Sequence, residues 1–138
     1  MDNEGDDYYG AHSFSQGASY YFGLGLFVDQ KGEDHYNAVS HAQGYAAHYS
    51  LAGFSDYEGN DSYNAKADSS AITQIIGGGR DHSIGIFFDH AGDDVYFVGN
   101  RSAGVGDLKG IGIFIDYYGD DTYWWYKNNI NSGSPSAG

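Results

Sequence analysis

Acidic side chains occupy the most regular positions of this 138-residue sequence. The eight-residue phrase Asp-x-x-Gly-[Asp/Glu/Asn]-Asp-x-Tyr occurs five times, starting at Asp2, Asp29, Asp56, Asp89 and Asp116. Successive copies start 27 residues apart, except that 33 residues separate the third from the fourth. These five residues form a first Asp column, and a second consists of Asp7, Asp34, Asp61, Asp94 and Asp121. A period of about 20–50 residues indicates structural units that stack on one another.

Stacking would bring like charges together. Equivalent residues would lie about 4.8 Å apart, the strand spacing of a sheet. There, two carboxylates repel by roughly 1 kcal/mol in water and roughly 3–4 kcal/mol at an effective dielectric constant of about 20. A third column, directly before the second Asp column, holds Asp6, Glu33, Asn60, Asp93 and Asp120. Its four acidic residues and the ten of the two Asp columns are 14 of the 19 acidic residues, and we expect them to line one edge of the stack.

Two interactions can offset this repulsion, and the sequence leaves both open. Each Asp can accept several backbone N–H groups of its turn, which favours the ionised form. Alternatively, Ca²⁺ can lie between carboxylates of successive units, because it prefers about six to eight oxygen ligands. The candidate calcium ligands are Asp29, Asp34, Asp56, Asp61, Asp89, Asp94, Asp116 and Asp121. The six histidines fall at unrelated positions of the repeat and share no transition-metal ligand spacing.

Short apolar stretches precede four of the phrases and predict buried strands. They span 24–28, 51–55, 84–88 and 111–115, with Phe27, Phe54, Phe87 and Phe114 at one shared position. Their β-branched and aromatic residues, interrupted by Gly, favour strands over helices. The Asp-x-x-Gly segment has turn composition, and a second short strand is expected at the Tyr position. The predicted fold is all-β, a parallel β-solenoid (β-helix) of about five 27-residue coils. A β-propeller and an antiparallel meander are the alternatives.

One domain is expected over residues 1–127, followed by a flexible polar tail at 128–138. A six-residue insertion falls between Asn64 and Ile76 and is expected to bulge from one face. Trp124, Trp125 and Tyr126 break the repeat and either cap the stack or form an interaction patch.

Charge and composition exclude several classes of partner. The net charge of −13, from 19 acidic and 6 basic residues, disfavours nucleic acids and anionic membrane surfaces. No apolar run approaches the roughly 20 residues of a membrane span, and no segment has the pattern of a signal peptide. Cysteine is absent, which excludes disulfides and thiolate metal sites.

Two copies of the phrase, at residues 89–96 and 116–123, are preceded by Gly-Ile-Phe-Phe and Gly-Ile-Phe-Ile and resemble the units of a known kind of repeat protein. With the Gln-Gly pairs at 16–17 and 43–44, they resemble units of large, mostly uncharacterised bacterial tandem-repeat proteins, in which G-[DN]-D-x-Y motifs are joined by Q-G-x-G stretches. The resemblance covers residues 2 to about 123 and implies a β-solenoid in an exported or surface protein, with no established activity. A fainter similarity links the Gly and Asp turns to calcium-binding RTX repeats, although the nonapeptide G-G-x-G-x-D is absent.

These features favour a structural or adhesive repeat protein at the cell surface or outside the cell, stabilised by calcium and able to self-associate through its end strands. An enzyme is not expected, because no carboxylate pair differs from the others as glycoside hydrolysis requires. A carbohydrate-binding or carbohydrate-cleaving β-helix, with a glycan partner, is the main alternative. Its site would lie near Arg80, Asp81 and His82, which occur in no other unit. Ice binding is a minor alternative, because no regular Thr-x-Thr array is present.

Overall fold

The computed structural model describes residues 1–65 and 72–125, and every regular element within these ranges is a β-strand. No helix of the described residues is long and apolar enough to cross a membrane. The all-β prediction is therefore confirmed for this part of the chain. The predicted tail, Tyr126 and the middle of the insertion lie outside the described residues.

The strands form four sheets. Sheet A consists of β1 (Tyr8–Gly10), β5 (His35–Asn37), β9 (Ser62–Tyr63), β13 (Val95–Val98) and β16 (Thr122–Trp125). Sheet B consists of β2 (Ser13–Ser15), β6 (Ser40–Ala42) and β10 (Thr73–Ile75). Sheet C consists of β3 (Ser19–Tyr20), β7 (Ala46–Ala47), β11 (Gly79–Arg80) and β14 (Gly106–Asp107). Sheet D consists of β4 (Leu24–Val28), β8 (Leu51–Asp56), β12 (Ile84–Asp89) and β15 (Ile111–Asp116).

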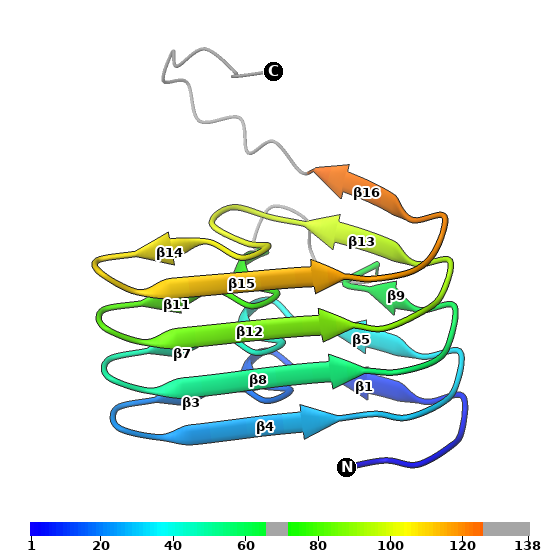
Figure 1. The fold of residues 1–138 in the computed structure, drawn as a ribbon, viewed down its shortest axis with the longest axis horizontal. Helices are drawn as coiled ribbons and strands as arrows, with labels where there is room; N and C mark the ends of the chain where they lie inside the picture. The colour runs from blue at the N-terminus through cyan, green and yellow to red at the C-terminus, as the bar shows by residue number, and fades with distance from the viewer. Residues whose placement is uncertain (66–71, 126–138) are drawn as a thin grey trace.

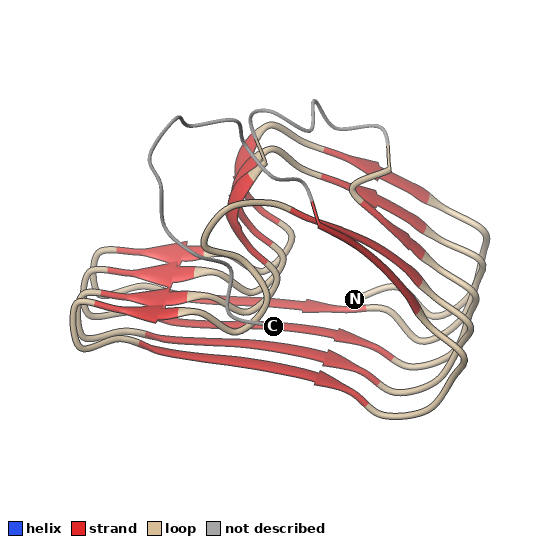
Figure 2. Ribbon diagram, turned by 90° about the horizontal axis from the view of Figure 1, so that it is seen from above, coloured by secondary structure: helices blue, strands red, loops and turns tan. Residues whose placement is uncertain are grey.

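Every described strand pair is parallel and joins equivalent residues of successive repeats. Tyr36 pairs with Tyr63 in sheet A, and Phe54 pairs with Phe87 in sheet D. The chain passes along the sheets in turn and returns to sheet A one strand further on, so the repeats lie one above another (Figures 1 and 2). The antiparallel meander is therefore wrong as an alternative.

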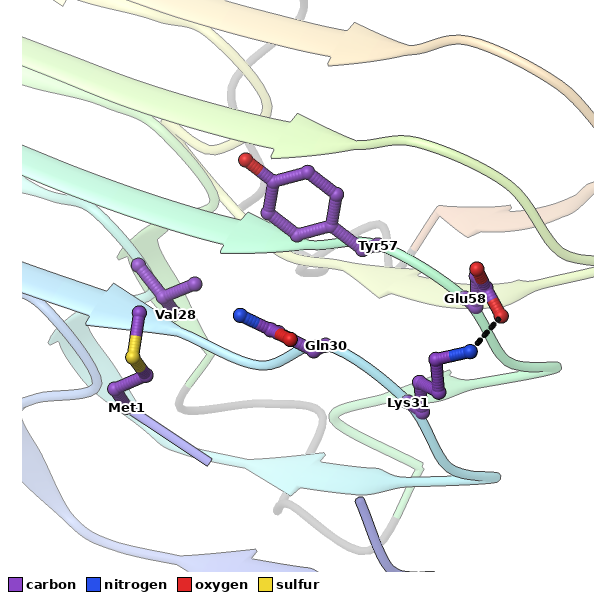
Figure 3. A pocket seen from close by; sticks show the side chains of 6 residues that line it. All are labelled: Met1, Val28, Gln30, Lys31, Tyr57 and Glu58. Atoms are coloured by element: carbon purple, nitrogen blue, oxygen red, sulfur yellow. Dashed lines mark ion pairs between the residues drawn. The ribbon is translucent and has the colours of Figure 1, made fainter. Parts of the chain in front are cut away.

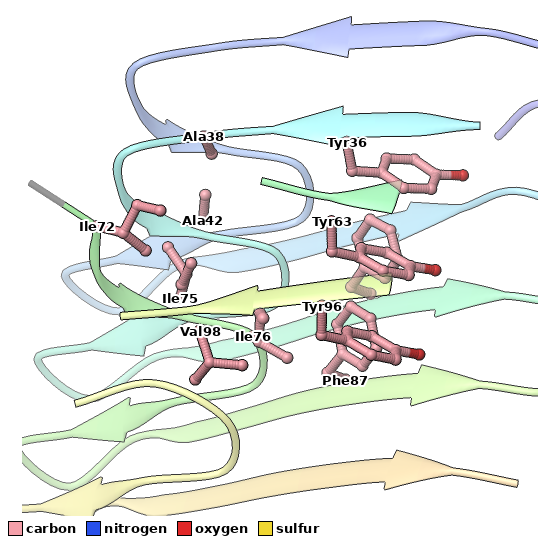
Figure 4. Packing of buried hydrophobic residues seen from close by; sticks show 11 residues of the cluster. Tyr36, Ala38, Ala42, Tyr63, Ile72, Ile75, Ile76, Phe87, Tyr96 and Val98 are labelled. Atoms are coloured by element: carbon pink, nitrogen blue, oxygen red, sulfur yellow. The ribbon is translucent and has the colours of Figure 1, made fainter. Parts of the chain in front are cut away.

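Two columns of rings fill the space between sheets A and D. Tyr36, Tyr63 and Tyr96 are fully buried and stack in parallel, with ring centroids 5.1 and 4.7 Å apart (Figure 4). Phe54 and Phe87 stack at 4.8 Å beside them, and Tyr36 meets Phe54 edge to face at 5.0 Å. Such aromatic pairs contribute about 0.5–1.5 kcal/mol each beyond the area they bury. This core fixes the register of the turns that carry the Asp columns.

The bend between sheets C and D repeats an unusual backbone conformation. Two consecutive residues have positive φ in each repeat, for example His48 and Tyr49 (both 58°), and none of the residues at these bends is Gly. The left-handed conformation costs roughly 1–2 kcal/mol per such residue. Stacking offsets this strain, because the His48 and Tyr49 N–H groups donate to Arg80 O and Asp81 O of the next repeat at 3.2 and 3.0 Å.

The Gly of every Asp turn except the first packs against the backbone of the preceding repeat. A Cβ at Gly92 would lie 1.6 Å from the carbonyl oxygen of Gly59, and one at Gly59 would lie 1.7 Å from that of Gly32. Backbone atoms fill the place of a side chain, so the turns can stack at strand spacing only if this residue is Gly.

We expect Gly92→Ala to lower the free energy of unfolding by about 3 kcal/mol or more, because the methyl group forces neighbouring turns apart. Gly53→Ala is the matched control, because its Cβ meets only the flexible Leu26 side chain, at 3.0 Å. This control should change stability by less than about 1 kcal/mol. Chemical denaturation measures both values, and equal effects of the two variants would contradict the stacked turns.

Candidate metal centre

The two Asp columns lie in the turns that lead from sheet D to sheet A. Asp56, Asp89 and Asp116 end the strands β8, β12 and β15, and Asp61 and Asp94 stand directly before β9 and β13. In-register pairing of the strands on both sides places each carboxylate over its equivalent in the next repeat, as shown for Asp56 and Asp89. The stacking of the acidic columns follows from the parallel register.

The inner side chains of both columns are buried, which differs from the expected charged edge, whereas those at the two ends (Asp2, Asp7, Asp116 and Asp121) are partly exposed. Asp29, Asp34, Asp56, Asp61, Asp89 and Asp94 are each at most 2% exposed. Only the intervening column, made of Asp6, Glu33, Asn60, Asp93 and Asp120, is exposed. The aromatic core draws the columns inward, because the Tyr hydroxyl groups end beside the carboxylates.

The second column forms a ladder of backbone hydrogen bonds. The N–H of Asp34 donates to Asp61 Oδ1 at 2.7 Å, and the N–H of Asp61 donates to Asp94 Oδ1 at 2.6 Å. Asp7 donates to Asp34, and Asp94 to Asp121, in the same way. One oxygen of each acceptor is thus stabilised by a single amide of the preceding repeat, whereas the first sequence-based interpretation expected several N–H groups of the same turn.

The first column accepts hydrogen bonds from the Tyr column. Tyr36 OH donates to Asp56 Oδ2 at 2.5 Å, and Tyr63 OH donates to Asp89 Oδ2 at 2.6 Å. Sequence reasoning did not identify these hydroxyl donors. The usable signal was the constant spacing of Tyr within a repeat whose strands stack in register.

Four buried carboxylate oxygens have no hydrogen-bond partner among the described residues: Asp56 Oδ1, Asp61 Oδ2, Asp89 Oδ1 and Asp94 Oδ2. A buried carboxylate without compensation is strongly disfavoured. The backbone ladder therefore accounts for only part of the acidic array, and a proton or a cation must neutralise the rest.

The same residues gather in three overlapping groups. Carboxylate oxygens lie within 4.8 Å of one another in each of the groups Asp34/Asp56/Asp61, Asp61/Asp89/Asp94 and Asp94/Asp116/Asp121. Asp61 and Asp94 each belong to two groups. Seven of the eight predicted ligands are brought together in this way, whereas Asp29 belongs to none of the three groups.

Burial makes these carboxylates weak acids. It raises the pKa of Asp61 to about 9, of Asp94 to about 8 and of Asp56 to about 7. Repulsion between carboxylates raises each pKa further. The charge of Asp56 acts on Asp61, and the charge of Asp89 acts on Asp56 and Asp94. Near neutral pH the array is thus poised between holding protons and holding a cation.

A hard divalent cation fits this donor set. Every side-chain donor in the three groups is a carboxylate oxygen, and the turns supply backbone carbonyls nearby, which are the ligands that Ca²⁺ prefers. A bound cation would supply the positive charge that the buried oxygens lack and would lower the pKa of the carboxyl groups around it.

The residues singled out beside the insertion form an exposed cluster of a different kind. The Asp81 carboxylate accepts from His48 Nδ1 at 2.5 Å and contacts His82 Nδ1 at 3.1 Å, which together lower the pKa of Asp81. Arg80 Nε lies 3.9 Å from Asp107 Oδ2. The general acid of a glycosidase needs a raised pKa, whereas the pKa of Asp81 is lowered.

A shallow hollow of about 420 Å³ lies at the edge of sheet D and is lined by Met1, Val28, Gln30, Lys31, Tyr57 and Glu58 (Figure 3). Lys31 Nζ and Glu58 Oε2 form an exposed ion pair there, at 3.2 Å. The hollow holds no group of convergent polar side chains comparable to the Asp columns.

No protein-family model matches the chain, and neither a curated protein nor a solved structure does. The chemistry of the site therefore rests on its own geometry.

In EDTA we expect the melting temperature to fall as pH rises from about 5 to about 9. The folded state holds protons on Asp56, Asp61 and Asp94, so its stability is greatest below the ordinary Asp pKa of 3.8 and is lost as pH rises through about 7 to 9. Calcium should remove most of this fall, because it binds the deprotonated form. Circular dichroism melts at three pH values measure both effects, and an identical pH profile in calcium and EDTA would contradict a cation site.

The variant Asp61→Asn tests whether this residue is a ligand of the cation. In EDTA at about pH 8 it should melt at a higher temperature than the parent, because folding must keep the Asp61 carboxyl group protonated at this pH, whereas the amide is neutral in both states and donates to neighbouring carboxylates. In calcium it should melt at a lower temperature, because a shared ligand is lost. The control is Asp93→Asn, the same change in an exposed residue of the turn, which should follow the parent in both solutions.

Proposed function

We propose that the chain is a parallel β-solenoid that serves as a structural or adhesive repeat module at the cell surface or outside the cell, with its turns stabilised by calcium. The observation that carries the proposal is the set of unpartnered, buried Asp oxygens repeated from turn to turn. The in-register parallel pairing of equivalent residues supports the solenoid. It also agrees with the resemblance to bacterial tandem-repeat surface proteins.

The charge of the array supports occupation of all three groups. They contain seven different carboxylates, Asp34, Asp56, Asp61, Asp89, Asp94, Asp116 and Asp121, with a total charge of −7 when ionised. Three divalent cations contribute +6, which leaves −1. Shared ligands at Asp61 and Asp94 place a carboxylate between neighbouring cations, which screens their mutual repulsion.

Self-association through the ends belongs to the same proposal. Strands β1, β2, β3 and β4 stand at one outer edge of their sheets, where backbone groups are not paired by a further strand of the described chain. Such edges accept further parallel strands, either from more repeats or from a second copy.

A carbohydrate-active protein is the second candidate, and two observations weigh against it. Asp56, Asp61 and Asp94, whose carboxyl groups have raised pKa, are at most 2% exposed, so a sugar cannot reach them. The exposed rings of Phe22, Tyr49 and His82 stack on one another with centroids 5.4 and 4.9 Å apart, so Tyr49 lies between two rings and cannot offer a face to a sugar. An ice-binding role has no Thr array to support it.

A structural role predicts that calcium increases resistance to mechanical unfolding. We expect single-molecule pulling from the two chain ends to give a higher unfolding force in calcium than in EDTA, because each bound cation ties neighbouring turns together. At a free calcium concentration of about 100 times the Kd, one site raises the free energy of unfolding by about 2.7 kcal/mol.

In the same pulling experiment, Asp61→Asn should remove most of the calcium effect, and Asp93→Asn should retain it. An unfolding force that calcium leaves unchanged would contradict the structural role of the cation.

A further inference from the structure

The outer face of sheet D is apolar and uncharged. Side chains alternate along its four strands, so that Ala52 and Phe54 point into the core while Leu51, Gly53 and Ser55 point outward. The outward positions are every second residue of each strand, beginning with Leu24, Leu51, Ile84 and Ile111. They hold Leu, Ile, Val or Phe, except for Gly53 and Ser55. This surface, here called the outer D face, is turned toward the viewer in Figure 1.

The outer D face is accessible rather than covered by another part of the described chain. Leu24, Leu26 and Ile111 are 66%, 68% and 53% exposed, and Leu51 and Ile84 are 42% and 39% exposed. The largest apolar patch on a typical monomer covers about 300–600 Å² and is often functional. Four strands at about 4.8 Å and five to six residues at about 3.3 Å give a flat area of roughly 350 Å².

Rings extend this face at both ends of the strands. Phe22 and Tyr49 border it at the bend from sheet C, in a column that continues with His82 and Lys109. Tyr57 and Tyr117 border it beyond the last strand residues, in a column that also holds Gln30 and His90. With these columns the area approaches roughly 500–600 Å², somewhat below the roughly 800 Å² per partner of a standard interface. A contact of this size belongs to the weak or transient class of protein interfaces.

Charge indicates which partner fits. The chain carries a net charge of −13, yet none of the outward residues of sheet D is acidic or basic. The exposed acids Asp6, Glu33, Asp93 and Asp120 lie in the turns beside the sheet. A second copy can therefore meet this face without like charges between the strands, and the repulsion between two chains of net charge −13 acts through the turns at its perimeter.

We infer that the outer D face is the interface of a symmetric dimer, in which sheet D of one copy packs face to face on sheet D of another. Two apolar sheets pack in this way about 10 Å apart, with their side chains interdigitated. A two-fold axis makes the contact self-complementary and leaves the strand edges at the ends of the stack free. The dimer uses none of the carboxylates of the two Asp columns, so it goes beyond the proposed calcium-stabilised module.

Sedimentation velocity of the full chain between about 2 and 200 µM tests this inference, in calcium and in EDTA. We expect a monomer–dimer equilibrium that Ile84→Lys shifts toward the monomer by at least tenfold in Kd. Ser55→Lys should act likewise, because it adds a charge to the face without removing an apolar side chain. The matched control is Ser62→Lys, the same change at a half-exposed outward position of sheet A, which should leave the Kd unchanged.

A melting curve of each variant establishes that it is folded. A parent protein that stays monomeric at every concentration would overturn the inference, as would a dimer that Ile84→Lys and Ser55→Lys leave intact. A dimer that persists in both solutions while calcium fails to stabilise the fold would sustain this interface and reject the calcium module.

Discussion

The burial of carboxylates one strand spacing apart is the constraint on which this structure depends. At about 4.8 Å and an effective dielectric constant of about 20, each neighbouring pair of charges repels by roughly 3–4 kcal/mol. Amides of the preceding repeat satisfy one oxygen of Asp61 and of Asp94, and Tyr hydroxyl groups satisfy one oxygen of Asp56 and of Asp89. The second carboxylate oxygen of each of these four residues has no hydrogen-bond partner among the described residues. These are the atoms that a proton or a cation would bind.

The rest of each repeat is arranged around that turn. The Tyr ring stack delivers the hydroxyl groups, and the neighbouring Phe stack holds the rings in place from sheet D. Gly92 leaves room for the carbonyl oxygen of Gly59, so that the turns can approach to strand spacing. Because every repeat uses the same contacts, a change that separates two turns disturbs the ring stack and the carboxylate ladder together.

Much of this arrangement could be predicted from the sequence. The predicted strand at 24–28 coincides with β4 (Leu24–Val28), and stacking brings together seven of the eight predicted ligands. Sheets B and C could not be predicted, because strands such as β2 (Ser13–Ser15) are short and lack an apolar pattern. The bends at His48 and Tyr49 carry no Gly signal, since contacts between repeats impose their conformation. The burial of the Asp columns could not be predicted either, because it depends on how the buried Tyr rings bring their hydroxyl groups to the carboxylates.

Anomalous diffraction from crystals soaked in terbium, a strongly scattering substitute for calcium, tests the central claim most directly. The account predicts a row of anomalous peaks along the stack axis, each within ligand distance of carboxylate oxygens from the groups built around Asp61 and Asp94. Ordered turns without such peaks, in which carboxyl groups of successive repeats hydrogen-bond directly to one another, would show that protons neutralise the array. Asp56 and Asp89 lying far apart in the crystal would contradict the stacked repeats themselves.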